Sequence, residues 1–239
     1  VLLCFCVTIA FFCVKAQPVI PNKVASWSFN GNFIDAGGNA INGTNFGATA
    51  TTNKFGQANA AMDFNNPSTT GAVVAYATHP ANAALNYSGT QNFSISLVVF
   101  VNSPLAHTVG LYDNNLNYFG YGMWIWQPGA APELRFNYKN GSLGALNVPI
   151  GQWIHICAIR EGGVLKLFIN GVLKASGPEG TLVPAYNFPA RFGSMFYMSQ
   201  PGIQYNGMLG KLDEVSIYNR ALTSAEVLQL AVALLPIKL

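Results

Sequence analysis

The chain has 239 residues, which is enough for one large all-β domain or two small ones. Only 9% of the residues are charged, the net charge is +3, and no stretch gathers basic residues, which argues against a nucleic-acid partner. Three of the four cysteines, Cys4, Cys6 and Cys13, lie in the first fourteen residues. Once these are removed, Cys157 has no partner for an intramolecular disulfide.

The first segment of the chain is an apolar run over residues 1–14, shorter than the roughly 20 residues that span a membrane. Val14-Lys15-Ala16, at the end of this run, is similar to a signal-peptide cleavage site. The sequence therefore predicts a secretory signal peptide over residues 1–16 and a mature domain over residues 17–239 without a membrane span. We expect a secreted or cell-surface protein.

Short strand-like segments separated by Gly-, Asn- and Pro-containing turns make up most of the remaining chain. They cover residues 24–29, 60–64, 71–76, 93–101, 121–126, 133–138, 143–148, 153–160, 164–169, 172–176, 192–198 and 207–218. Asn140-Gly141 and Asn170-Gly171 predict hairpin turns, and Thr223-Ser-Ala-Glu226 predicts a capping box at the start of a short helix. This pattern predicts one all-β domain, a two-sheet antiparallel jelly-roll sandwich with one short C-terminal helix.

The titratable residues do not form a recognisable catalytic motif. A retaining glycosidase needs two carboxylates about 5–5.5 Å apart. Asp213 and Glu214 are adjacent, so in a regular strand they point to opposite faces and do not pair. His155 and Cys157 lie two residues apart in an apolar strand, which is more typical of buried strand residues than of a catalytic dyad. The sequence predicts no enzymatic activity.

Aromatic residues give a stronger functional signal. Tyr121, Trp124, Trp126 and Tyr138 gather in one predicted hairpin, and Tyr205 lies in a later loop rich in amides. Because side chains alternate along a strand, the two tryptophans share one face. If that face is exposed, they form a platform on which sugars stack, and if it is buried, they belong to the core. We predict that these five residues bind the ligand.

Four segments resemble the concanavalin A-like, laminin-G-like jelly-roll family in the right order along the chain. They are SWSFNGNFIDAGGNAINGT, KFGQANAAMDFN, GQWIHICAIREGGVLKLFINGVL and GKLDEVSIYNRALTSAEV. The resemblance covers roughly residues 24–230 and implies two curved antiparallel sheets. It also implies a structural calcium on the rim, with Asn30, Asp35 and Asp213 as ligands.

The residues themselves leave the calcium site open. Asp35 and Asp213 are two of four aspartates in the chain, and both lie beside turns rich in carbonyl groups, which suit calcium. The alternative is that Asp35 caps a turn through its own backbone and that Asp213 pairs with Lys211 or Arg220.

Together these features predict a secreted, non-catalytic module that binds a polysaccharide or glycoconjugate, with calcium holding the rim. Two alternatives stay open. One is a structural or adhesive module of a surface protein that binds an extracellular protein. The other is an atypical glycoside hydrolase or polysaccharide lyase.

Overall fold

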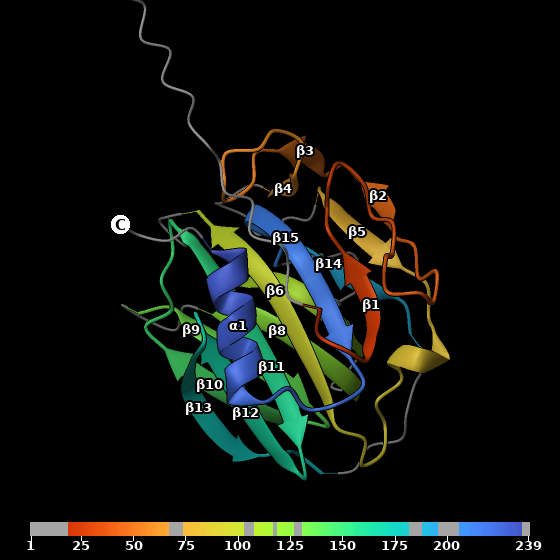
Figure 1. Ribbon diagram of the computed structural model, residues 1–239, viewed down its shortest axis with the longest axis vertical. Coiled ribbons are helices and arrows are strands. Elements are labelled where there is room, and N and C mark those ends of the chain that lie inside the picture. The colour runs from red at the N-terminus through yellow and green to blue at the C-terminus, as the bar shows by residue number, and fades with distance from the viewer. Residues whose placement is uncertain are drawn as a thin grey trace, which may run out of the picture.

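The computed structural model describes residues 19–66, 74–102, 108–116, 119–126, 131–181, 188–195 and 206–235. The predicted signal peptide and Tyr205 lie outside these ranges. The described strands form two antiparallel sheets that pack face to face, with one helix outside them (Figure 1). This confirms the predicted jelly-roll sandwich.

The helix packs on the outer face of the eight-stranded sheet. Its strands, in spatial order, are β13 (Val172–Pro178), β12 (Val164–Ile169), β11 (Trp153–Glu161), β6 (Phe93–Val101), β15 (Leu209–Tyr218), β4 (Ala61–Asn65) and β3 (Thr49–Thr51), with β1 (Lys23–Trp27) also pairing with β15.

The seven-stranded sheet lies behind it in the view of Figure 1. Its strands, in spatial order, are β10 (Gly141–Leu146), β9 (Glu133–Tyr138), β8 (Phe119–Trp126), β7 (Val109–Leu116), β14 (Ala190–Phe192), β5 (Tyr76–His79) and β2 (Thr44–Phe46). A short 3₁₀ helix, η1 (Ala83–Leu85), follows β5.

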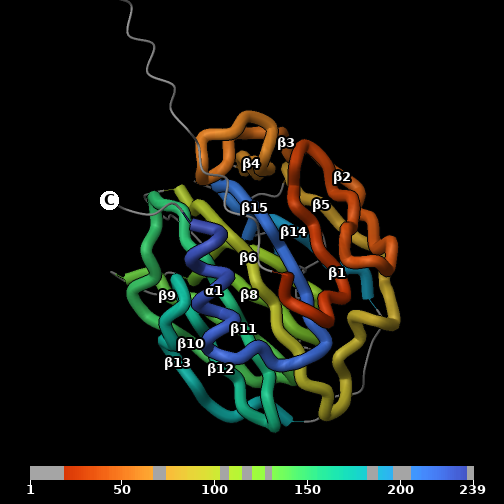
Figure 2. Tube along the Cα trace, in the orientation of Figure 1, coloured from red at the N-terminus to blue at the C-terminus, as the bar shows by residue number. Residues whose placement is uncertain are grey.

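The two ends of the domain meet in the eight-stranded sheet. Strand β1 pairs with β15, and Figure 2 shows the red strand β1 beside the blue strand β15. Trp27 at the end of β1 is fully buried, and its indole Nε1 donates to the carbonyl of Ile41, 2.9 Å away. This pairing closes the sandwich with residues almost 200 positions apart in the sequence.

The hairpin turns follow from residues that accept a positive φ. Asn170 and Gly171 adopt φ of 51° and 79° between the paired residues Ile169 and Val172, as predicted. The other predicted turn is shifted by one residue. Lys139 and Asn140 occupy its two central positions, with φ of 51° and 63°, and Gly141 already pairs with Tyr138.

Helix α1 (Ser224–Leu234) begins with the predicted capping box. The backbone amide of Glu226 donates to Thr223 Oγ1, 3.2 Å away, and the backbone amide of Thr223 donates to the Glu226 carboxylate, 2.8 Å away. Val227 and Leu230 are buried in a small cluster with Cys157 on the outer face of the eight-stranded sheet. The helix therefore covers part of the outer face of the eight-stranded sheet.

Candidate functional site

The two tryptophans of β8 lie on the outer face of the seven-stranded sheet. Met123 and Ile125, which alternate with them, are fully buried in the core between the sheets. Trp124 is half-buried, and Trp126 keeps 39% of its surface exposed. Of the two orientations that the sequence leaves open, the structure therefore shows the outward one.

Trp126 is held in place by charged residues of the neighbouring strand β9. The guanidinium of Arg135 lies 5.0 Å from the centroid of the Trp126 ring, a cation–π contact. Arg135 Nη2 is also 2.8 Å from Glu133 Oε2. The carboxylate of Glu133 occupies the space that a Cβ at position 144 would need, so Gly144 makes room for the pair. The ring of Trp126 is thus oriented before any ligand arrives.

A second aromatic cluster lies on the same face, at the opposite edge of the sheet. Phe46 of β2 and Tyr76 of β5 are cross-strand partners, and their rings stack at 4.8 Å with an angle of 9° between the planes. The guanidinium of Arg191 lies 4.8 Å from the centroid of Tyr76. Phe46 is 43% exposed. This cluster was not predicted from the sequence, because no local pattern indicates that Phe46 and Tyr76 meet.

Polar residues connect the two clusters. In the register of the strands, Thr78, Arg191, Asp113, Gly122 and Asn137 form one row across the sheet. The carboxylate of Asp113 fills the space above Gly122. Asn137 is only 8% exposed, and its Oδ1 has no hydrogen-bond partner among the described residues. Such an acceptor is costly to bury unpaired, so it is suited to bind a ligand or water.

Two of the predicted ligand-binding residues lie elsewhere. Tyr121 and Tyr138 are buried between the sheets, and their hydroxyl groups donate to the carbonyls of Leu85 and Tyr87, 3.0 and 2.9 Å away. Burial raises the pKa of both hydroxyls. The structure therefore corrects this prediction, because both rings pack in the core and are not available to a ligand. Tyr205 lies outside the described residues.

Asp35, the first aspartate of the predicted calcium site, organises its own loop instead. Its Oδ1 accepts from the amides of Ser26 and Gly37, 2.8 and 2.6 Å away, and its Oδ2 accepts from the amide of Ile41, 2.9 Å away. The carbonyl of Asn30 accepts from the side chain of Asn32. Turn capping, the alternative for Asp35, is what the structure shows.

Asp213 lies in a bulge of β15. The pairing with β6 shifts register between Asp213 and Ser216, and Glu214 adopts a φ of 53°. As a result, Lys54 Nζ is 2.7 Å from Asp213 Oδ2 and 3.9 Å from Glu214 Oε1. Burial raises the pKa of the Asp213 carboxyl, and the adjacent Lys54 ammonium opposes this. The two adjacent carboxylates reach one cation, contrary to the expectation for a regular strand, and the partner is neither Lys211 nor Arg220.

These contacts do not fit the ligand set that calcium requires. Calcium takes six to eight oxygen ligands. The carboxylate oxygens of Asp35 instead accept hydrogen bonds from three backbone amides, and an oxygen of Asp213 accepts one from the Lys54 ammonium. Within the described ranges, no group of three or more His, Cys, Asp or Glu side chains is arranged to hold a metal ion. The calcium stays a prediction of the resemblance, and the predicted ligands do not support it.

His155 and Cys157 are both fully buried on the outer side of β11. His155 Nε2 is 2.8 Å from Ser96 Oγ, and burial together with the Lys54 charge lowers its pKa to about 3. Burial raises the pKa of the Cys157 thiol. Neither side chain is suited to catalysis, because a substrate does not reach them.

Comparison with known sequences assigns the family. Residues 68–228, more than half of the chain, match the family described as the concanavalin A-like lectin/glucanases superfamily. The chain belongs to this superfamily. No curated protein sequence matches it. The part of the chain that the structure describes contains no helix long and apolar enough to cross a membrane.

Solved structures of domains from other proteins share the fold. Domain 4 of AbnA, an extracellular arabinanase from Geobacillus stearothermophilus solved with arabinotriose, is 24% identical with a TM-score of 0.62, over 88% of this chain and 98% of that domain. A structure of botulinum neurotoxin type C, whose cell entry is described as dependent on two ganglioside molecules, is 14% identical with a TM-score of 0.66, over 89% of this chain and 51% of that chain. The binding domain of botulinum neurotoxin DC, solved with rat synaptotagmin II, is 14% identical with a TM-score of 0.68, over 89% and 52%. The chain thus spans about half the length of these toxin domains, and at these identities the likeness shows the fold.

Proposed function

We propose that the chain is a secreted, non-catalytic carbohydrate-binding module, and that a polysaccharide or glycoconjugate binds on the outer face of the seven-stranded sheet. The observation that carries the proposal is the pair of partly exposed aromatic clusters on this face, around Trp126 and Phe46, with polar side chains between them. The apolar run over residues 1–14 supports the secreted location.

Aromatic rings with polar side chains between them can bind both the apolar face and the hydroxyl groups of a sugar. The apolar C–H face of a sugar ring stacks on an aromatic ring, while its hydroxyls bind polar groups such as the Asn137 carboxamide, which has an unpaired acceptor. Four strand spacings separate β8 from β2, which amounts to about 19 Å. A ligand that contacts both Trp126 and Phe46 is therefore an oligosaccharide or longer chain.

The carboxylates of this face support a binding role over a catalytic one. Glu133 and Asp113 are two strands apart and differ by four residues in register, which places their backbones about 16 Å apart. Glycosidases hold their two carboxyl groups about 5–9.5 Å apart. Glu133 is also paired with Arg135, so neither acid is positioned as half of a hydrolytic pair.

Two proteins with the same fold support the proposal of carbohydrate binding. An arabinanase domain that this chain matches over nearly its whole length is solved with arabinotriose, and a matched toxin is described as interacting with gangliosides. Arabinan and ganglioside glycans are therefore the first members of a test panel.

The test is the binding of a polysaccharide and glycan panel, by affinity electrophoresis and calorimetry, to the wild type and to Trp126→Ala and Phe46→Ala. An indole has about 250 Å² of surface, so covering the 39% that is exposed removes about 100 Å² from water. At 25 cal/mol per Å², this is worth about 2.5 kcal/mol. We therefore expect Trp126→Ala to weaken binding at least tenfold.

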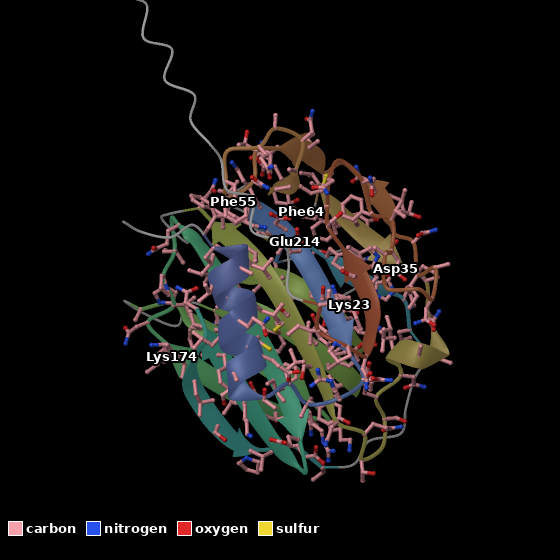
Figure 3. All side chains as sticks on the ribbon, in the orientation of Figure 1. Lys23, Asp35, Phe55, Phe64, Lys174 and Glu214 are labelled. Atoms are coloured by element: carbon pink, nitrogen blue, oxygen red, sulfur yellow. The ribbon has the colours of Figure 1, made fainter. Side chains whose placement is uncertain are left out.

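Phe55→Ala is the matched control, because Phe55 is 44% exposed and belongs to the loop between β3 and β4 of the eight-stranded sheet, at the end of the molecule near Glu214 (Figure 3). It should bind as the wild type does. A folded wild type that binds no glycan of the panel contradicts the proposal, and so does a glycan whose affinity is the same in all four proteins.

A further inference from the structure

Lys54 is a buried cation beside Asp213, one of the three residues that the resemblance implies as calcium ligands. Its side chain is 2% exposed, and its Nζ contacts both carboxylates of the β15 bulge, Asp213 at 2.7 Å and Glu214 at 3.9 Å. Figure 3 shows that Phe55, the residue after Lys54, and Glu214 lie near each other at one end of the molecule. Asp35 lies apart from them, beside β1.

We propose that the Lys54 ammonium takes the place of the calcium ion in this chain, pairing with Asp213 and attracting the neighbouring Glu214 carboxylate so that it holds the β15 bulge, and that the fold is therefore independent of calcium. Either cation lowers the repulsion between these two carboxylates, the ammonium with one positive charge and calcium with two. Asp213 is buried and Glu214 is partly buried, so the two adjacent carboxylates repel each other and a nearby positive charge stabilises them. A tethered ammonium supplies this charge permanently, whereas an ion is lost at low concentration.

The loop that carries Lys54 is built to aim it inward. The Asn53 side-chain oxygen accepts from the amides of Phe55 and Gln57, 2.9 and 3.1 Å away, and the Asn53 Nδ2 donates to the Gln57 side chain. The ring of Phe55 lies 5.2 Å from Lys54 Nζ. The loop is thus fixed by its own hydrogen bonds, and Lys54 reaches Asp213 from 159 positions earlier in the sequence.

The second carboxylate oxygen of Asp213 is consistent with a single ammonium as the partner of this side chain. Asp213 is only 1% exposed, and its Oδ1 has no hydrogen-bond partner in the described part of the chain. The ammonium therefore occupies one oxygen of Asp213 and leaves the other free. If Lys54 is removed, both oxygens become available to a divalent ion, together with the Glu214 carboxylate.

The test compares thermal unfolding of the wild type, Lys54→Ala and Lys211→Ala in EDTA and in millimolar calcium. The wild type should unfold at the same temperature in both. Lys54→Ala should lose about 10 °C in EDTA, the size expected for breaking a buried ion pair in a domain of this length, and should regain part of that loss in calcium. Lys211→Ala, which removes a lysine of β15 itself, should be insensitive to calcium.

Three results would overturn the proposal. They are a wild type that EDTA destabilises, a Lys54→Ala variant as stable as the wild type, and a variant that calcium does not stabilise. If Lys54→Ala does not fold in EDTA, its refolding in calcium is measured instead. Calorimetric titration of the wild type with calcium gives an independent answer, because stoichiometric binding contradicts the proposal.

Discussion

The buried imidazole of His79 makes the stability of the domain depend on pH. It is fully buried, with the Trp27 ring stacked 5.1 Å away. His79 Nδ1 is 2.9 Å from the carbonyl oxygen of Pro80, which only accepts, so Nδ1–H donates and Nε2 accepts from the Tyr112 hydroxyl, 3.0 Å away. Both nitrogens of the neutral imidazole ring therefore have a hydrogen-bond partner. Burial lowers the pKa of His79 to about 4, although the Pro80 bond and the Asp35 charge oppose this.

The direction of the pH effect follows from this lowered pKa. Between pH 6.5 and pH 4 the unfolded chain binds a proton at His79 and the native protein does not, so stability falls as the pH falls through this window. From pH 7 to pH 5, linkage with these two pKa values gives a loss of about 2 kcal/mol from this one side chain. His79→Gln keeps a polar side chain without a proton to bind and should not show this loss.

The assay is urea unfolding of the wild type and His79→Gln at pH 7 and at pH 5. The free energy of unfolding of the wild type should fall by about 2 kcal/mol more than that of the variant over this interval. Comparing the two proteins over the same interval cancels the contributions of other titrating groups, such as His155 and Asp213. Equal losses in both proteins would refute the reasoning.

Two further predictions concern helix α1 and the surface that it covers. Thr223→Ala removes the oxygen that accepts from the Glu226 amide, so urea unfolding should show a loss of about 0.5–2 kcal/mol, whereas Ser224→Ala, one position later, should cost less. An unchanged Thr223→Ala protein would argue against the cap. Cys157 is fully buried beside this helix, and burial raises its thiol pKa, so the Cys157 thiol should react with a disulfide reagent only when the protein unfolds. Reaction of Cys157 in the native protein would contradict its placement.

Local patterns in the sequence predicted much of the fold. Alternation in residues 121–126 showed that Trp124 and Trp126 share a face, and the Thr223–Glu226 capping box placed the helix. Which face the tryptophans take was not predictable, because Met123 and Ile125 are also apolar. The choice depends on how β8 packs against the other sheet.

The features that were missed depend on contacts between distant residues. Phe46 belongs to a three-residue strand and meets Tyr76 only through the β2–β5 pairing. Lys54 meets Asp213 across 159 positions, and the bulge at Glu214 changes the side on which that carboxylate lies. The resemblance suggested calcium ligands from residue types alone, whereas the structure shows that backbone amides and an ammonium already occupy them.

The most direct test of the binding face uses the four tryptophan indole N–H signals in a ¹H–¹⁵N correlation spectrum, assigned by substitution and recorded during titration with a glycan from the panel. Trp124 and Trp126 lie on the outer face of the seven-stranded sheet, Trp27 is buried, and Trp153 lies on the eight-stranded sheet. We expect the Trp124 and Trp126 signals to shift with a common saturation curve, while those of Trp27 and Trp153 stay in place. A shift of Trp153 without Trp126, or no shift at saturating glycan, would contradict the proposed site.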